Sequence, residues 1–242
     1  MYNTFDKIAL MCMDARMNFI ADSINDGKTL FIRNAAGTPN GAIKTLENIF
    51  LQNPISKIIY YPHTDCGACK FTYSLLSKKE SSTKEVEENL VSILRKSNLA
   101  FASSEEVIKV VHLLGVSYFK NTYPNLNIDT KIIDTSTTVN GDKAMLILPP
   151  SSETYSHLCD KLSLPFKSTY VSQHSSIEES ICDVQLAKAA LGIKNFTVLQ
   201  RPNFATENAI LRLKEVIGKE ANLRIIVDKT ITQTNKKLQK IH

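Results

Sequence analysis

The chain has 242 residues, of which 43% are hydrophobic and 22% are charged, a balance that is ordinary for a globular protein. This length allows one large domain or two smaller ones with a sizeable core. The formal net charge of +5 is not gathered into the clustered basic stripe that a nucleic-acid interface needs, so we expect no nucleic-acid partner.

We expect neither a membrane span nor a signal peptide. No apolar run approaches the ~18 residues that cross a bilayer. The first residues show neither a basic region nor a small-residue cleavage site. We therefore expect a cytoplasmic protein without a membrane partner. The odd number of cysteines favours metal binding or burial over a disulfide framework; they are Cys12, Cys66, Cys69, Cys159 and Cys182.

Strand and helix patterns alternate along the first part of the chain. Buried strands are expected at 7–12, 29–33, 57–61 and 128–133, and helices at 43–53, 88–97 and 104–118. Short apolar strands separated by helices indicate an α/β fold with a parallel sheet that helices cover on both faces.

The alternation then begins again. Further strands are expected at 144–148, 168–172, 194–199 and 222–227. The segment Ser176-Ile-Glu-Glu179 predicts a capping box that opens a helix ending at Gly192. Thr206 is expected to cap another helix, which ends at Gly218.

The two parts match in the order of their elements, which suggests an internal repeat. The matching segments are 30–34 with 169–173, 56–63 with 193–200, and 127–134 with 221–228. We therefore predict a tandem pseudo-dimer, with one domain at 1–142 and a degenerate repeat at 143–242. Chance similarity between two α/β segments is the alternative.

Two short segments carry residues suited to metal chemistry. Cys12 and His63 follow the first and third predicted strands, and Cys66 lies three residues after His63. Ligands of open parallel sheets gather at the carboxyl ends of the strands, so these side chains converge if the two strands are neighbours. Two thiolates and one imidazole are good zinc ligands, and three protein ligands leave a fourth position open.

Asp14 and Arg16 lie two and four residues beyond Cys12. A carboxylate beside a fixed guanidinium stays ionised, because the positive partner favours its charged form. Asp14 is thus able to orient a water molecule on the metal, or to ligate the metal itself if it turns away from Arg16. A purely structural ion pair is the alternative.

These segments resemble the β-class carbonic anhydrases, whose marks are Cys-x-Asp-x-Arg, Arg-Asn-Ala and His-x-x-Cys-Gly. The chain has Cys12-Met-Asp14-Ala-Arg16, Arg33-Asn34-Ala35 and His63-Thr-Asp-Cys66-Gly67 in this order. The resemblance covers about residues 7 to 142. It implies Cys12, His63 and Cys66 as zinc ligands and Asp14 and Arg16 as the catalytic dyad. It also implies that zinc lowers the pKa of bound water to about 7, and that the hydroxide attacks carbon dioxide to give bicarbonate.

The sequence departs from that family in its organisation. The resemblance implies an N-terminal helix and an active-site cleft between two subunits, whereas here the first strand begins within ten residues of the start. The second half is expected to replace the partner subunit, and further homo-oligomerisation stays open. Leu148 or Pro149, Gln200 and about Asn203 stand at the positions of the ligands, so we expect one zinc ion per chain.

Other residues near these motifs allow two interpretations. Arg33 and Asn34 are expected to shape the loop beside the site. Asp65 is either an acceptor behind the ligands or a surface carboxylate. Cys69 has a metal-binding spacing from Cys66, but we expect it to begin the next helix instead.

Three functions remain compatible with this sequence. The leading one is zinc-dependent reversible hydration of carbon dioxide. The second is hydrolysis of carbonyl sulfide or carbon disulfide at the same site. The third is a zinc-binding protein with a regulatory rather than a catalytic function, which the altered second half makes credible.

Overall fold

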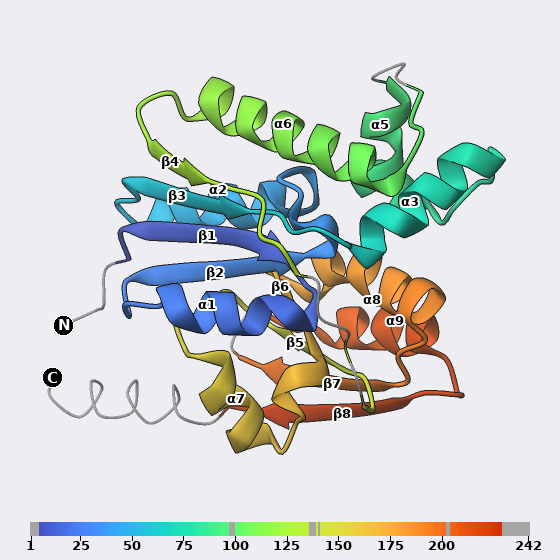
Figure 1. Cartoon of the computed structure of the whole chain (residues 1–242). Coiled ribbons are helices and arrows are strands. Elements are labelled where there is room, and N and C mark those ends of the chain that lie inside the picture. The colour runs from blue at the N-terminus through green and yellow to red at the C-terminus, as the bar shows by residue number, and fades with distance from the viewer. Residues whose placement is uncertain (1–4, 97–99, 136–138, 140, 202–203, 229–242) are drawn as a thin grey trace, which may run out of the picture.

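The computed structural model describes residues 5–96, 100–135, 139, 141–201 and 204–228. Within these residues the strands form one eight-stranded sheet in the order β4-β3-β1-β2-β6-β5-β7-β8 (Figure 1). The strands are β1 Lys7–Cys12, β2 Thr29–Asn34, β3 Lys57–Tyr61, β4 Asn127–Thr130, β5 Ala144–Leu148, β6 Thr169–Gln173, β7 Asn195–Gln200 and β8 Asn222–Val227.

Helices cover both faces of the sheet, with α1 and α7 side by side in front of it in Figure 1 and α2 and α8 behind it. The α/β class predicted from the sequence is therefore confirmed. Among the described residues, no helix combines the length and the apolar character needed to cross a bilayer. The α-helices are α1 Asn18–Ile24, α2 Ile43–Gln52, α3 Gly67–Lys78, α4 Lys84–Val86, α5 Ser92–Lys96, α6 Ser104–Thr122, α7 Tyr155–Leu162, α8 Ile177–Leu191 and α9 Glu207–Ile217. Short 3-10 segments include η1 Ala15–Met17, η2 Ala35–Gly37 and η5 Phe166–Ser168.

The sheet is parallel within each half and mixed as a whole. All pairings among β1–β4 and among β5–β8 are parallel. The halves meet where β2 and β6 pair antiparallel through Arg33 and Gln173. The expectation of a parallel sheet therefore holds up to this junction. Because the two sets of strands run in opposite directions, their carboxyl ends lie at opposite edges of the sheet.

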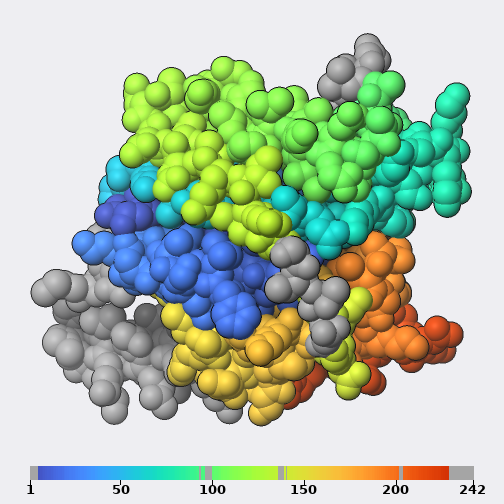
Figure 2. Space-filling model, in the orientation of Figure 1, coloured from blue at the N-terminus to red at the C-terminus, as the bar shows by residue number. Residues whose placement is uncertain are grey.

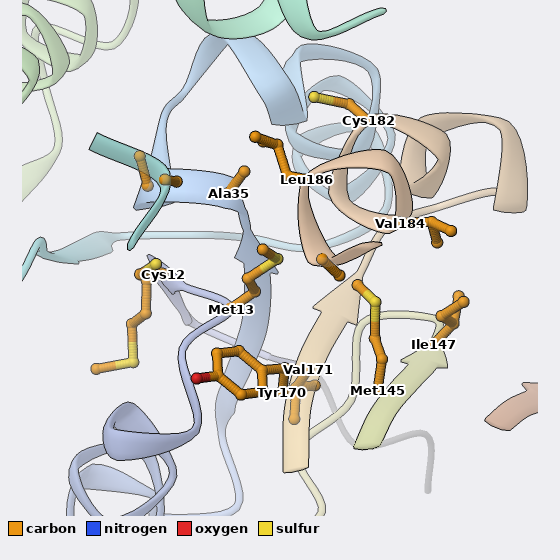
Figure 3. Close-up of a cluster of buried hydrophobic side chains, with 14 of the residues drawn as sticks. Cys12, Met13, Ala35, Met145, Ile147, Tyr170, Val171, Cys182, Val184 and Leu186 are labelled. Atoms are coloured by element: carbon orange, nitrogen blue, oxygen red, sulfur yellow. The ribbon is translucent and has the colours of Figure 1, made fainter. Parts of the chain in front are cut away.

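The two halves share one core. The central strands β2, β5 and β6 are buried at every position, because helices cover both faces of the sheet. Met13 of the first half packs in the same apolar cluster as Met145, Val171 and Leu186 of the second (Figure 3). Figure 2 shows the first half, coloured blue to green, packed along a broad boundary against the second, coloured yellow to red. Each buried aliphatic side chain contributes about 1.5–3 kcal/mol to folding.

One helix start differs from its prediction. Ser176 precedes α8, but its side chain makes no capping hydrogen bond. Glu179 instead accepts hydrogen bonds from the backbone nitrogen and the hydroxyl of Thr45, at 3.1 and 3.0 Å. The predicted capping box is therefore wrong, because a contact with α2 engages its glutamate. Thr206 caps α9 as predicted, accepting from the backbone nitrogen of Ala209 at 3.1 Å.

Candidate metal centre

Three buried side chains converge at the carboxyl ends of β1 and β3, which are neighbours in the sheet. Cys12 ends β1, His63 follows β3, and Cys66 precedes α3. Their exposed fractions are 2%, 1% and 2%. Sγ of both cysteines and a ring nitrogen of His63 all lie within 4.8 Å of one another. The convergence expected from strand order is therefore present.

The spacing of the two sulfur atoms fits a zinc ion. Sγ of Cys12 lies 3.7 Å from Sγ of Cys66, and both thiols are free. Two sulfurs at ~2.3 Å from a tetrahedral zinc ion are about 3.8 Å apart, whereas a disulfide would bring them to ~2.05 Å. The donor set, two thiolates and an imidazole, is one that zinc prefers.

The ring of His63 turns one nitrogen toward this group. Its Nδ1 lies 2.7 Å from the carbonyl oxygen of Thr64 and 3.0 Å from Oγ1 of Thr135. A carbonyl only accepts, so Nδ1 carries the proton and Nε2 keeps a lone pair. Nε2 is buried without a hydrogen-bond partner among the described residues. A buried acceptor without a partner is costly, and a metal ion would satisfy it.

Asp14 and Arg16 form a doubly hydrogen-bonded pair beside the ligand group. Arg16 donates from Nε to Oδ1 of Asp14 at 2.9 Å and from Nη2 to Oδ2 at 2.7 Å. The backbone nitrogen of Arg16 also donates to Oδ1, at 3.0 Å. Oδ2 lies 3.9 Å from Nε2 of His63. The carboxylate of Asp14 thus faces the ligand group, and the planar guanidinium of Arg16 holds it in place through two hydrogen bonds.

The guanidinium of Arg16 is itself fixed from a second side. Its Nη1 donates to Oδ2 of Asp65 at 2.9 Å and to the carbonyl oxygen of Thr135 at 3.0 Å. Asp65 also pairs with Lys70 and is half exposed. Of the two interpretations of Asp65, the structure favours the acceptor behind the site.

Charge and burial act in opposite directions on the ionisable groups here. Burial raises the pKa of Asp14, but the hydrogen bonds from Arg16 and the nearby His63 outweigh it and leave the pKa below its ordinary value. Burial raises the pKa of the Cys12 thiol well above its ordinary value. A metal ion held by Cys12 would favour the thiolate, because its positive charge would outweigh the effect of burial on the pKa of the thiol.

Arg33 and Gly37 shape the segment that carries Cys12. Arg33 is fully buried and donates to the carbonyl oxygens of Cys12 and Asp14, both at 2.7 Å. Gly37 has φ of +65°, and a Cβ placed on it would lie 2.9 Å from the backbone nitrogen of Cys12. Only glycine allows both this conformation and this close approach. The supporting role expected for Arg33 is consistent with these contacts.

A cleft of about 610 Å³ opens beside the ligand group and is walled by both halves. Asp14, Arg16 and Lys70 line it from the first half, and Lys143 and Tyr170 from the second. The aspartate therefore connects the buried group to solvent-accessible space.

The structure also places the remaining residues considered from the sequence. Cys69 is buried in α3 and lies outside the ligand group. Leu148 is buried, and Asn203 lies outside the described residues. Sequence reasoning missed Thr135 and Tyr170. Thr135 follows the expected fourth strand and had a positional signal, whereas no spacing in the sequence points to Tyr170.

The chain was compared with protein families, curated proteins and solved structures. No family model matches the chain, and no curated protein matches it. Among solved structures, a tetrameric β-carbonic anhydrase of Sordaria macrospora is similar, with a TM-score of 0.40 and 15% identity over 55% of this chain and 77% of that one. A carbonic anhydrase of Glaciozyma antarctica has a TM-score of 0.35 and 24% identity over 53% of this chain and 75% of that one. The case for a function therefore rests on the site itself.

Proposed function

We propose that this protein is a zinc-dependent carbonic anhydrase of the β class, which reversibly hydrates carbon dioxide to bicarbonate. The observation that carries the proposal is the buried Cys12, His63 and Cys66 group with the paired Asp14 and Arg16 between it and a cleft. Three protein ligands leave the fourth position of a tetrahedral zinc ion open, as in catalytic rather than structural sites.

Zinc, when bound, supplies hydroxide at neutral pH by lowering the pKa of water to about 7. Asp14 acts as an acceptor that orients the attacking water, because an ionised carboxylate has no proton to donate. Arg16 keeps Asp14 ionised and holds both of its oxygens, so the carboxylate does not need to reorganise. Removal of Asp14 would therefore affect turnover more than zinc binding.

We further propose that the chain is a fused pseudo-dimer with domains 1–142 and 143–242. Strand order supports this proposal. Outward from the junction of β2 and β6, the first half has the order β2, β1, β3, β4 and the second half has the order β6, β5, β7, β8. Each half therefore begins with its own second strand and continues with its first, third and fourth. The strand registers also agree with each other. Cys12 pairs with Asn34 as Leu148 pairs with Gln173.

Among its described residues, the second half offers no equivalent ligand set. In the proposed repeat, Leu148 corresponds to Cys12, which agrees with the strand register, and Gln200 corresponds to His63 by the match of 56–63 with 193–200. Beyond Gln200, Arg201 pairs with Glu153 and, at 3.3 Å, with Asp228. An ion-paired cluster therefore lies near the position of a second metal site. We accordingly propose one zinc ion per chain.

The decisive experiment combines metal analysis with stopped-flow hydration of carbon dioxide at pH 7 and pH 8.5. Purified full-length protein should contain one zinc ion per chain and catalyse hydration. Asp14→Asn should keep the zinc ion and lose about a hundredfold in kcat/KM. The matched control is Asp129→Asn, which removes a carboxylate of β4 that pairs with Lys57, at the opposite end of β3 from His63.

Each outcome separates the rival functions. Zinc-loaded protein without hydration at either pH contradicts the carbonic anhydrase proposal. Turnover of carbonyl sulfide or carbon disulfide in its place would assign the same site to hydrolysis, and no turnover of any of them would favour a regulatory zinc protein. Two zinc ions per chain would contradict the degenerate second half.

A further inference from the structure

One side chain of the second half reaches the cleft beside Asp14. Tyr170 lies in β6, is only 4% exposed, and lines the cleft together with Asp14 and Arg16. Figure 3 shows its ring beside Met13, with the hydroxyl directed toward the segment that follows β1. The second half thus contributes a polar atom to the candidate site.

The position of Tyr170 is fixed by the neighbouring backbone. The backbone nitrogen of Val171 donates to the carbonyl oxygen of Met13 at 2.9 Å. On the other side, Nδ2 of Asn18 donates to the carbonyl oxygen of Thr169 at 3.0 Å. These bonds join β6 to the segment that carries Cys12 and Asp14. Tyr170 and the candidate catalytic carboxylate therefore belong to one rigid unit.

No hydrogen bond of the Tyr170 hydroxyl is found within the described part of the chain, and its Oη is not among the fully buried atoms that lack a partner, so it is accessible from the cleft. Two fully buried tyrosines are paired: Tyr60 donates to the carbonyl oxygen of Val111 at 3.2 Å, and Tyr155 pairs with Gln173. A tyrosine hydroxyl both donates and accepts hydrogen bonds, so one that is accessible from a cleft can bind an oxygen atom of a ligand. An unpaired hydroxyl on a cleft wall is therefore available to a ligand.

We infer that Tyr170 is a substrate-contacting residue, which donates a hydrogen bond from Oη to an oxygen of the carbon dioxide or bicarbonate bound beside Asp14. This inference rests on the proposed function. Asp14 and Tyr170 would make complementary contacts with the ligand. The ionised carboxylate of Asp14 only accepts hydrogen bonds, whereas the hydroxyl of Tyr170 supplies a donor for an oxygen of the ligand.

The charge that develops during the reaction gives this contact a catalytic consequence. Carbon dioxide is neutral and a weak acceptor, whereas bicarbonate is an anion, and hydrogen bonds to an anion are stronger. A donor aimed at the oxygen that gains charge lowers the barrier more than it stabilises the neutral substrate. Burial raises the pKa of Tyr170, so its hydroxyl keeps the proton that it donates.

The test compares Tyr170→Phe with Tyr73→Phe in the full-length protein. Tyr73 donates to the carbonyl oxygen of Ala102 and does not line the cleft, so its variant removes a hydroxyl without changing the site. Two measurements are made. Bicarbonate is titrated into cobalt-loaded protein and followed by the visible absorption of the metal. Hydration kinetics are measured on zinc-loaded protein, with metal content and Tm as checks of folding.

We expect Tyr170→Phe to bind bicarbonate about tenfold more weakly and to lose about tenfold in kcat/KM, as removal of a hydrogen bond to a charged group predicts. Its metal content should stay at the wild-type value, and Tyr73→Phe should stay within about twofold of wild type in both measurements.

Binding and kcat/KM of Tyr170→Phe within twofold of wild type would overturn this inference and leave the proposed function standing. Wild-type protein that takes up zinc but neither hydrates carbon dioxide nor binds bicarbonate would overturn both. Loss of metal from Tyr170→Phe would show that the residue supports the fold of the site instead of contacting the ligand.

Discussion

The guanidinium of Arg33 donates a hydrogen bond to the carbonyl oxygen of Asp14, at 2.7 Å. A second bond, also of 2.7 Å, reaches the carbonyl oxygen of Cys12, and Nη1 donates to Oδ1 of Asn18 at 3.0 Å. The same guanidinium lies 4.9 Å from the ring centroid of Tyr155. One buried cation thus holds the backbone on both sides of Met13, between a candidate ligand and the candidate catalytic carboxylate.

Replacement of Arg33 should therefore disturb the metal site through the backbone of Cys12 and Asp14. Arg33→Met removes a charged donor from the carbonyl oxygens of Cys12 and Asp14, and the second of these keeps only its bond from the backbone nitrogen of Met17. We therefore expect a loss of about 3 kcal/mol in the free energy of unfolding. Zinc affinity should fall at least tenfold, which is about the effect of losing a residue that supports a ligand. Denaturant unfolding and zinc titration measure the two effects. Arg95→Met is the control, because Arg95 pairs with Glu87 at the surface; equal effects of the two variants would contradict the role of Arg33.

Gly37 should not tolerate a side chain. Gly37→Ala combines a positive φ with a Cβ only 2.9 Å from the backbone of Cys12, so we expect a destabilisation of about 2–3 kcal/mol and weaker zinc binding. Gly27→Ala is a matched control, because Gly27 has φ of +76° but nothing within 4 Å of its Cβ position. Unfolding experiments on both variants separate strain in φ from the contact. Equal losses would show that the approach to Cys12 is unimportant.

Acid should weaken the link between Lys7 and Asp26. The hydrogen bond from Lys7 lowers the pKa of Asp26 to about 2. A carboxyl group whose folded-state pKa is depressed stabilises the protein above its unfolded pKa of ~3.9, and this contribution disappears as pH falls through the folded value. Because both side chains are partly exposed, solvent screens the pair and the effect on stability should be small. Asp26→Asn should therefore flatten the loss of stability between about pH 4 and pH 2, and an unchanged slope would contradict the shift.

Removal of zinc should lower thermal stability. A ligand that binds only the folded state adds about 4 kcal/mol at a thousandfold excess over its Kd. For a domain of this size that corresponds to roughly 10 °C in Tm. We expect a chelator to produce this decrease in wild-type protein but not in Cys12→Ser, which lacks one of the candidate sulfur ligands. A chelator effect of the same size in both proteins would place the metal elsewhere.

Local patterns in the sequence were enough to predict the elements that carry the candidate site. The strands ending at Cys12 and preceding His63 are short apolar runs, and such runs report burial directly. The positions of Cys12, His63 and Cys66 at strand ends then predicted convergence once β1 and β3 were taken as neighbours. Their assignment as zinc ligands stays a prediction.

Contacts between distant segments were beyond such reasoning. Glu179 had the spacing of a capping box, but Thr45 of α2 engages it, and no local pattern reveals that neighbour. Thr135 supports His63 from 72 residues away along the chain. These pairings depend on how helices and strands pack, because they join side chains from different elements.

The sequence by itself determined which residues are suited to hold a metal ion, because strand periodicity and ligand spacing are local properties of the chain. Only the tertiary structure decided what surrounds them. The antiparallel pairing of β2 with β6 turns the second half against the first, and the bond from Val171 to Met13 places Tyr170 beside Asp14. This arrangement depends on a shared core built from both halves, and the free energy of that core is a property of the whole fold.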